Sequence, residues 1–186
     1  MHDKRDWVVK VLGFWLGLCT ALAHADPATW LLVEANTNTL TVLQGKTVVD
    51  KFDYVALGRG GTSNKRKRGD NSTPLGEFHV AWVNRESPFH IFFGLDFPTV
   101  ELADQAYREK RIDRDTYYSI LDALRERRLP PQNTSMGGRI GIHGLGSADL
   151  KIHRGFNWTK GCVALTNREI ERLARWVQIG TRVVIR

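Results

Sequence analysis

The first part of the chain alternates short apolar runs with turn-forming residues. Residues 30–57 are rich in Val, Leu, Thr and Phe, and turn signals at residues 36–38 and 44–45 interrupt them. Runs of β-branched and aromatic residues bounded by Asn and Gly are typical of strands joined by tight turns. The pattern predicts successive antiparallel strands, then a glycine-rich and basic loop from Gly58, and a further strand over residues 78–83.

The pattern changes over residues 84–132, where charged residues dominate and apolar residues recur at helical spacing. The residues with the spacing i, i+3, i+4 and i+7 are Tyr117, Ile120, Leu121 and Leu124. They predict one face of a helix that Pro130 and Pro131 end, and an earlier helix is expected over about residues 100–110. We interpret residues 84–132 as a helical insert in a strand-rich domain, and we expect it to form a wall or lid over a site.

The last part of the chain returns to strand and then to helix. Residues 139–143 predict a strand, and a loop follows them. Thr166 and Glu169 have the spacing of a capping box, which opens a helix that Gly180 ends. Residues 181–185 predict a final strand. The chain as a whole therefore predicts a mainly β fold with a helical insert and a C-terminal helix and strand.

Residues 1–25 have the organisation of a secretory signal peptide rather than that of a membrane span. A charged start precedes a short apolar stretch, and residues 23–25 form a small-x-small cleavage site. Cys19 lies in this stretch, but Leu18 precedes it where a lipoprotein signal needs a small residue, so Cys19 is expected to leave with the peptide. We expect an exported protein of the periplasm or cell envelope, whose mature catalytic domain, residues 26–186, keeps no membrane span.

The net positive charge of the chain limits which classes of binding partner are expected. The chain has a formal net charge of +7, which suits an anionic neighbourhood such as a cell wall or a membrane surface. Nucleic acid is not expected as a partner, because an exported chain rarely meets it. The basic run at residues 65–68 is interpreted as a solvated loop rather than a docking site.

Cys162 is the one cysteine expected in the mature chain, and it follows His143 by nineteen residues. A single thiol beside a glycine in an exported protein favours a reactive nucleophile over a disulfide. Because the thiolate is the nucleophilic form, we expect a neighbouring imidazolium or backbone N–H groups to lower the pKa of this thiol. His143 ends a predicted strand and could supply the imidazole. The alternatives are an inert buried cysteine, a core histidine, or a metal site that also uses His153.

Glycines flank both candidate residues. Gly161 lets the backbone approach closely, so that N–H groups around Cys162 could point at a developing oxyanion. The carbonyl of Gly144 could accept a hydrogen bond from the second ring nitrogen of His143 and thereby orient the ring. Such an assembly performs acyl transfer through a thioester.

These residues resemble the signature of the L,D-transpeptidase (YkuD) catalytic domain, in which a histidine, a spacer and Ser or Thr precede Gly-Cys. The matching segments are residues 142–144 and 159–163, and residues 73–78 resemble the TPxGxF turn of that family. The resemblance implies a YkuD-like β-sandwich and a cysteine that attacks the diaminopimelyl carbonyl of a peptidoglycan stem peptide. It implies no cofactor and no metal.

By position, the resemblance assigns four catalytic roles. Cys162 matches the nucleophile, His143 the general base, Gly144 the carbonyl that orients this base, and Gly161 an oxyanion-hole N–H.

Four further residues are candidates for binding substrate. Thr159 either contacts the site or caps the turn, and Trp158 forms either a pocket wall or part of the core. His153 lies in the loop between the catalytic pair. Arg139 is one strand away and is a candidate binder of a substrate carboxylate.

One departure leaves the reaction outcome open. Ala164 stands where many transpeptidases carry an arginine two residues after the cysteine. With the long insert, this is similar to a branch that includes hydrolases which detach a lipoprotein from peptidoglycan. We expect an L,D-transpeptidase, with an L,D-endopeptidase or carboxypeptidase-type hydrolase as the alternative and a non-catalytic cell-wall-binding module as a second one. The expected partners are stem peptides and an envelope lipoprotein or amine acceptor.

Overall fold

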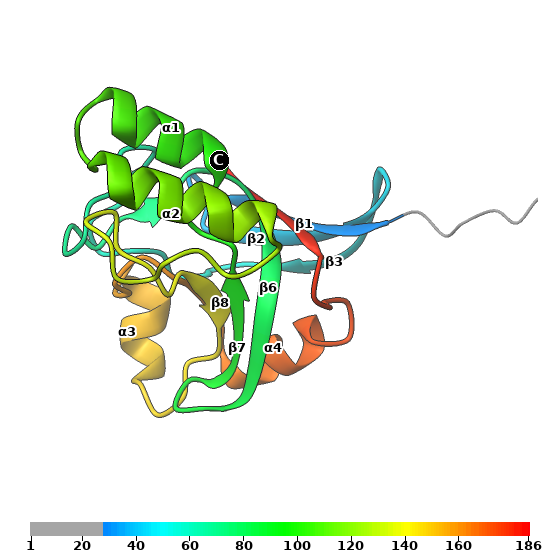
Figure 1. Ribbon diagram of the computed structural model, residues 1–186. Helices are drawn as coiled ribbons and strands as arrows, with labels where there is room; N and C mark the ends of the chain where they lie inside the picture. Colours follow the sequence, from blue (N-terminus) through cyan, green and yellow to red (C-terminus); the bar gives the residue numbers. More distant parts are fainter. Residues whose placement is uncertain (1–27) are drawn as a thin grey trace, which may run out of the picture.

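A computed structural model describes residues 28–186 (Figure 1), and the expected signal peptide with Cys19 lies outside them. The elements in chain order are β1 Thr29–Glu34, β2 Thr39–Gln44, β3 Thr47–Phe52, β4 Thr62–Ser63, β5 Thr73–Pro74, β6 Gly76–Ser87, β7 His90–Leu95, α1 Val100–Arg108, α2 Arg114–Arg125, β8 Gly141–His143, α3 Leu150–Gly155, β9 Val163–Ala164, α4 Asn167–Leu173 and β10 Arg182–Ile185. No helix in this described part is both long and apolar enough to cross a membrane.

Eight strands form one mixed sheet in the order β3-β2-β1-β10-β6-β7-β8-β9, and β4 and β5 form a separate short pair. The first three strands pair antiparallel, as predicted. Two pairings within the eight-stranded sheet are parallel, β1 with β10 and β8 with β9, and the separate pair β4 and β5 is parallel as well. The predicted mainly β fold is confirmed.

Strand β6 joins the two halves of this sheet. Residues 76–79 pair with β10, and the rest of the strand pairs with β7 across two irregularities of register. Irregularities of this kind bend a strand and increase its twist. Leu31 of β1 and Phe93 of β7 are both fully buried in a single hydrophobic core. One continuous sheet therefore builds the predicted sandwich-like core, rather than two separate sheets.

The predicted helical insert is shorter than residues 84–132. Residues 84–87 continue β6 and residues 90–95 form β7, so the first part of the prediction is wrong. The reason is burial, because every residue from Ile91 to Leu95 is buried, and such a run gives no helical or alternating pattern. The two helices themselves are present, although α2 ends at Arg125, well before the prolines.

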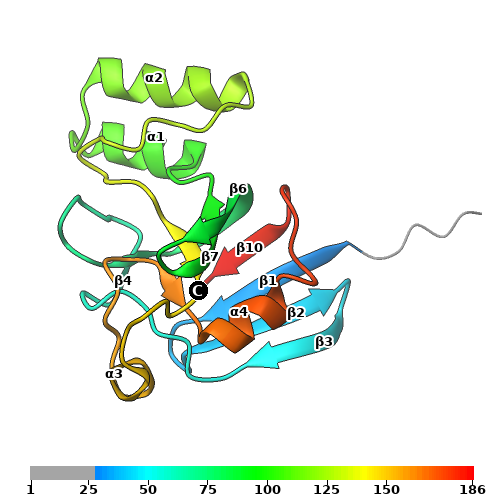
Figure 2. The same cartoon turned by 90° about the horizontal axis from the view of Figure 1, so that it is seen from below.

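Helices α1 and α2 pack against each other on one side of the molecule, away from β2 and β3 (Figures 1 and 2). The rings of Tyr107 and Tyr117 stack with centroids 4.6 Å apart, and the Tyr117 hydroxyl donates to Asp104. Thr99 and Asp113 cap the two N-termini. Caps and the stacked rings hold the pair as one unit.

The C-terminal elements follow the prediction with two differences. The capping box of Thr166 and Glu169 is present, but α4 ends at Leu173 rather than near Gly180. A helix over residues 150–155, α3, replaces part of the expected loop. This helix is too short to show an apolar period, and Asp149 caps it.

Candidate active site

The parallel pairing of β8 and β9 brings the candidate nucleophile and base together. His143 pairs with Ala164, and extending this register by two residues places Cys162, which directly precedes β9, opposite Gly141. Side chains alternate between the two faces of a sheet, so His143 and Cys162 project from the same face. Gly141 places no side chain between them.

This face opens into a cleft of about 850 Å³. Its aromatic lining residues are Trp82, Phe89, Phe92 and Trp158. Its cationic lining residues are Arg59, Arg66, Arg68, Arg139 and Lys160. No carboxylate in the described part of the chain lines the cleft, so its charge suits an anionic substrate.

His143 is held as a neutral imidazole. Its Nδ1 lies 2.6 Å from the carbonyl oxygen of Gly144, and a carbonyl can only accept, so Nδ1 carries the proton and Nε2 the lone pair. Burial lowers the pKa of His143, His153 lowers it further, and the Gly144 hydrogen bond opposes this. The expected orienting carbonyl is therefore in place. A Cβ at Gly144 would lie 2.6 Å from the Phe89 carbonyl oxygen, which explains the glycine.

Cys162 rests as a thiol. Its Sγ donates to the carbonyl of Arg139 at 3.5 Å, and no hydrogen bond within residues 28–186 joins it to His143. Burial raises the pKa of Cys162 to about 11, although the Gly141 backbone N–H and the Arg66 guanidinium oppose this. The expectation that the resting environment lowers this pKa is wrong. A thiol with a raised pKa becomes nucleophilic only if a base takes its proton during the attack.

Thr159 shapes the loop that carries the thiol. Its Oγ1 accepts from the N–H of Gly161 at 3.1 Å and donates to the carbonyl of Cys162 at 2.7 Å. The Gly161 N–H is thus used inside the loop, which does not match its expected role in an oxyanion hole. The N–H of Cys162 has no acceptor among the described residues, so it is the donor left for an oxyanion. Of the two roles considered for Thr159, the geometry favours the turn.

The other three candidate binding residues lie at different depths. Trp158 lines the cleft, edge-on to the His143 ring with centroids 6.1 Å apart. Its indole N–H donates to Nδ1 of His153 at 3.4 Å. His153 is buried on α3 and lines none of the cleft, so its predicted contact with substrate is not supported. Arg139 presents its carbonyl to the thiol, while its exposed side chain lies at the rim.

Sequence reasoning missed Arg66. It belongs to the basic run interpreted as solvated, yet only 6% of it is exposed, and it lines the cleft together with Cys162. Nothing local distinguishes it from Lys65 or Arg68, which are exposed. The interpretation of the run as a solvated loop is therefore wrong for this one residue.

The insert contributes to the cleft in a different way than expected. No residue of α1 or α2 lines it, whereas residues from both ends of the 84–132 range do, namely Asn84, Ser87, Pro88, Phe89, Phe92 and Gln132. The turn between the helices instead holds the basic loop, because Glu109 pairs with Lys65 at 2.9 Å and with Arg111 at 2.8 Å. Hydrogen bonds from these residues and Gln105 lower the pKa of Glu109 to about 2. The strand part of the 84–132 range thus forms a wall of the cleft, whereas its helices contact the basic loop instead of covering the cleft.

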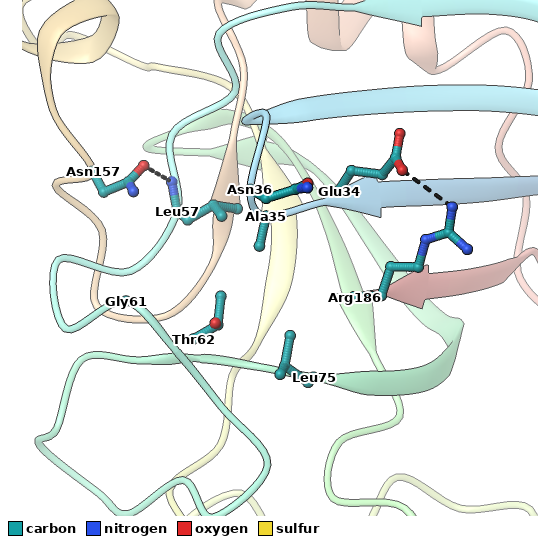
Figure 3. Close-up of a pocket in the computed structure, with 9 residues that line it drawn as sticks. All are labelled: Glu34, Ala35, Asn36, Leu57, Gly61, Thr62, Leu75, Asn157 and Arg186. Atoms are coloured by element: carbon teal, nitrogen blue, oxygen red, sulfur yellow. Dashed lines mark hydrogen bonds and ion pairs between the residues drawn. The ribbon is translucent and has the colours of Figure 1, made fainter.

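A second pocket, of about 700 Å³, shares no lining residue with the cleft (Figure 3). Asn157 at its edge accepts a hydrogen bond from the N–H of Leu57 at 2.8 Å and another from the Asn38 amide at 2.7 Å. These two hydrogen bonds attach the segment just before Trp158 to the backbone of Leu57 and to the side chain of Asn38. The ion pair of Glu34 with Arg186 lies on another wall. Among the described residues, no cysteine, serine or histidine lines this pocket.

Residues 28–185 match the family model described as the YkuD L,D-transpeptidase catalytic domain. Among solved structures, the helical cell shape determining protein Pgp2 of Campylobacter jejuni, as its K307A mutant, is similar, with 20% identity and a TM-score of 0.58 over 86% of this chain and 47% of that one. Bd1075 of Bdellovibrio bacteriovorus is similar with 19% identity and a TM-score of 0.52, over 89% of this chain and 50% of that one. The chain thus spans about half the length of either relative. A search of curated protein sequences gave no match.

Proposed function

The chain belongs to the L,D-transpeptidase catalytic-domain family, whose model matches residues 28–185, and we propose that it is an exported cysteine enzyme performing acyl transfer on peptidoglycan stem peptides. One observation carries the proposal. Cys162 and a neutral, carbonyl-oriented His143 share one face of adjoining strands inside a cleft lined by cations.

The first half of the reaction forms a thioester. The Sγ atom of Cys162 attacks the carbonyl carbon of the diaminopimelyl residue, while its proton passes to Nε2 of His143. The carbonyl oxygen takes up the negative charge, and the free N–H of Cys162 is suited to stabilise it. When the tetrahedral intermediate collapses, the C–N bond breaks, and the departing amine of D-alanine takes the proton from His143.

The second half releases the acyl group. An amine acceptor attacks the thioester carbonyl and gives up a proton through His143, which returns it to the sulfur of Cys162, so that a new amide forms. Water attacking at the same position leaves a carboxyl group, which is the outcome of the alternative, an L,D-endopeptidase or carboxypeptidase-type hydrolase. An acceptor amine must be held in line with the carbonyl, whereas water needs no dedicated subsite.

The charge of the cleft supports a substrate with free carboxylates. Arg59, Arg68 and Lys160 are exposed and line it, and no carboxylate among the described residues opposes them. Stem peptides carry such carboxylates, and cationic side chains attract and orient them. In the hydrolytic alternative, an envelope lipoprotein joined to the stem peptide by an amide is the departing amine, and the stem peptide remains the acyl donor.

Mass spectrometry of reaction products tests the proposal. The mature chain, residues 26–186, is incubated with a defined tetrapeptide stem in heavy-oxygen water, with and without an added amine acceptor. A transpeptidase gives the amine adduct, and a hydrolase gives a carboxyl group that carries heavy oxygen. Cys162→Ala is the matched control, because it removes one sulfur at the loop edge and leaves little cavity.

Labelling by a carbapenem separates the enzyme from a non-catalytic wall-binding module. A nucleophilic Cys162 opens the ring of the carbapenem, and a mass shift then maps to this residue. A folded protein that acquires no adduct on Cys162 and releases no product from sacculi would support the binding module instead.

A further inference from the structure

Arg66 is a buried arginine held between three segments. Its Nε donates to the carbonyl of Ser72 at 3.0 Å, its Nη1 to that of Met136 at 2.6 Å and its Nη2 to that of Lys160 at 3.3 Å. Its guanidinium lies 5.5 Å from the ring centroid of Phe97. The three carbonyl acceptors and the aromatic contact fix the position of the planar guanidinium and therefore of its positive charge.

Two glycines leave the space that this guanidinium fills. A Cβ at Gly137 would overlap Nη1 of Arg66, and a Cβ at Gly161 would lie 3.3 Å from its Nε. Both glycines have positive φ, at 85° and 125° respectively. Side chains rarely adopt this conformation, so glycine serves both the backbone path and the fit of Arg66.

Arg66 also holds the peptide that precedes the nucleophile. The carbonyl of Lys160 and the N–H of Gly161 belong to one peptide group. Arg66 binds that carbonyl, and Thr159 binds that N–H. The next peptide group contains the free N–H of Cys162, so the two contacts together fix the direction in which this donor points.

We propose that Arg66 is a positioning residue of the proposed acyl transfer, which fixes the Lys160–Gly161 peptide and supplies a permanent positive charge beside Cys162. The proposal rests on the function proposed above. Two residues after the cysteine this chain has Ala164, which is uncharged and fully buried in β9. Both the attacking thiolate and the later oxyanion are negative, and a buried cation stabilises such charges more strongly than an exposed one.

The other charges around the thiol define the controls. The titratable and charged side chains that line the cleft with Cys162 are Arg59, Arg66, Arg68, Arg139, His143 and Lys160. Burial lowers the pKa of the Arg66 guanidinium, and the nearby Asp70 of the basic loop and Cys162 oppose this lowering. Arg68 lines the same cleft from the same loop but is exposed, which makes Arg68→Met the matched control for Arg66→Met.

The test is the rate of Cys162 alkylation by iodoacetamide as a function of pH, which needs no stem peptide and so stands apart from the proposed function. Loss of an adjacent opposite charge raises a thiol pKa by about one unit, so less thiolate is present at each pH. The greater nucleophilicity of the more basic thiolate offsets part of this loss, and the expected net decrease for Arg66→Met is about fourfold. Because Arg68 is exposed to solvent, Arg68→Met is expected to leave the rate of Cys162 alkylation unchanged.

Arg66→Lys keeps the charge but loses the planar fork. We expect its alkylation profile to stay close to that of the unmodified protein, while acylation by a carbapenem slows at least about tenfold, since charged hydrogen bonds are lost. A folded Arg66→Met with unchanged alkylation, or equal decreases in Arg66→Met and Arg68→Met, would overturn the proposal. If Arg66→Met does not fold, the test rests on Arg66→Lys alone. Unchanged acylation by the carbapenem or slowed alkylation of Cys162 in Arg66→Lys would contradict the proposal.

Discussion

Replacing Thr159 by valine keeps the shape of the side chain and removes one buried hydroxyl. That hydroxyl accepts from the Gly161 N–H and donates to the Cys162 carbonyl, and Thr159 is only 3% exposed. The substitution therefore breaks two hydrogen bonds in the loop that carries the nucleophile and leaves two backbone groups without partners. The folded protein should lose stability, and the loop should lose its fixed geometry.

The expected loss follows from the two bonds. Each buried backbone group left without a hydrogen-bond partner lowers the free energy of unfolding by about 1–3 kcal/mol. Burial of the additional valine methyl group raises it by about 1 kcal/mol. For the two groups together, the net loss of unfolding free energy is about 3 kcal/mol, the middle of the resulting range, which for a chain of this size lowers the Tm by about 9 °C. A small misplacement of the attacking atom costs far more in rate, about 100-fold in acylation.

Thr159→Ser is the matched control, because it keeps the hydroxyl and loses a methyl group, at a cost of about 1 kcal/mol. The assays are thermal unfolding followed by circular dichroism and the rate of carbapenem adduct formation followed by mass spectrometry. If Thr159→Val acylates as fast as Thr159→Ser, the loop bonds do not set the geometry of the site. Faster acylation in Thr159→Val would return the freed Gly161 N–H to the oxyanion-hole role first expected for it.

Three further predictions follow from the site and from the contacts of Glu109. Burial lowers the pKa of His143 from 6.5, so the acidic limb of the pH–rate profile should have its midpoint below pH 6.5. His143→Ala should remove this limb and slow turnover on the order of 10²–10⁴-fold. A midpoint above pH 6.5 would contradict the assignment of His143 as the base. Gly144→Ala should destabilise the fold by about 1–3 kcal/mol, because the added Cβ would overlap backbone atoms. Gly155→Ala is the control, because a Cβ at Gly155 meets nothing within 4 Å. Equal Tm values for the two variants would argue against close packing around Gly144. The pKa of Glu109 falls from 4.5 to about 2 on folding. The unmodified protein should therefore be more stable than Glu109→Gln above pH 4.5, and this difference should disappear as the pH falls toward 2. Urea unfolding of both proteins at several pH values measures the difference.

Local patterns in the sequence determined the class of the fold and singled out His143 and Cys162 as the candidate reacting pair. Turn signals between β-branched runs predicted the first three strands, and the capping box at Thr166 predicted the start of α4. Glycines next to His143 and Cys162 pointed to backbone groups at the site. The Gly144 carbonyl lies where that pattern predicted it. These features depend on neighbouring residues, so they are visible without the fold.

Only the tertiary structure decided which charges and hydroxyls act at the site. Arg66 is buried by acceptors that lie 70 and 94 residues away along the chain, whereas its neighbours in the basic run stay in solvent. The raised pKa of Cys162 and the use of the Gly161 N–H inside the loop likewise arise from packing around the cleft. Burial and Coulomb interactions depend on distances in space, and a run of basic residues carries no information about which of them the fold encloses.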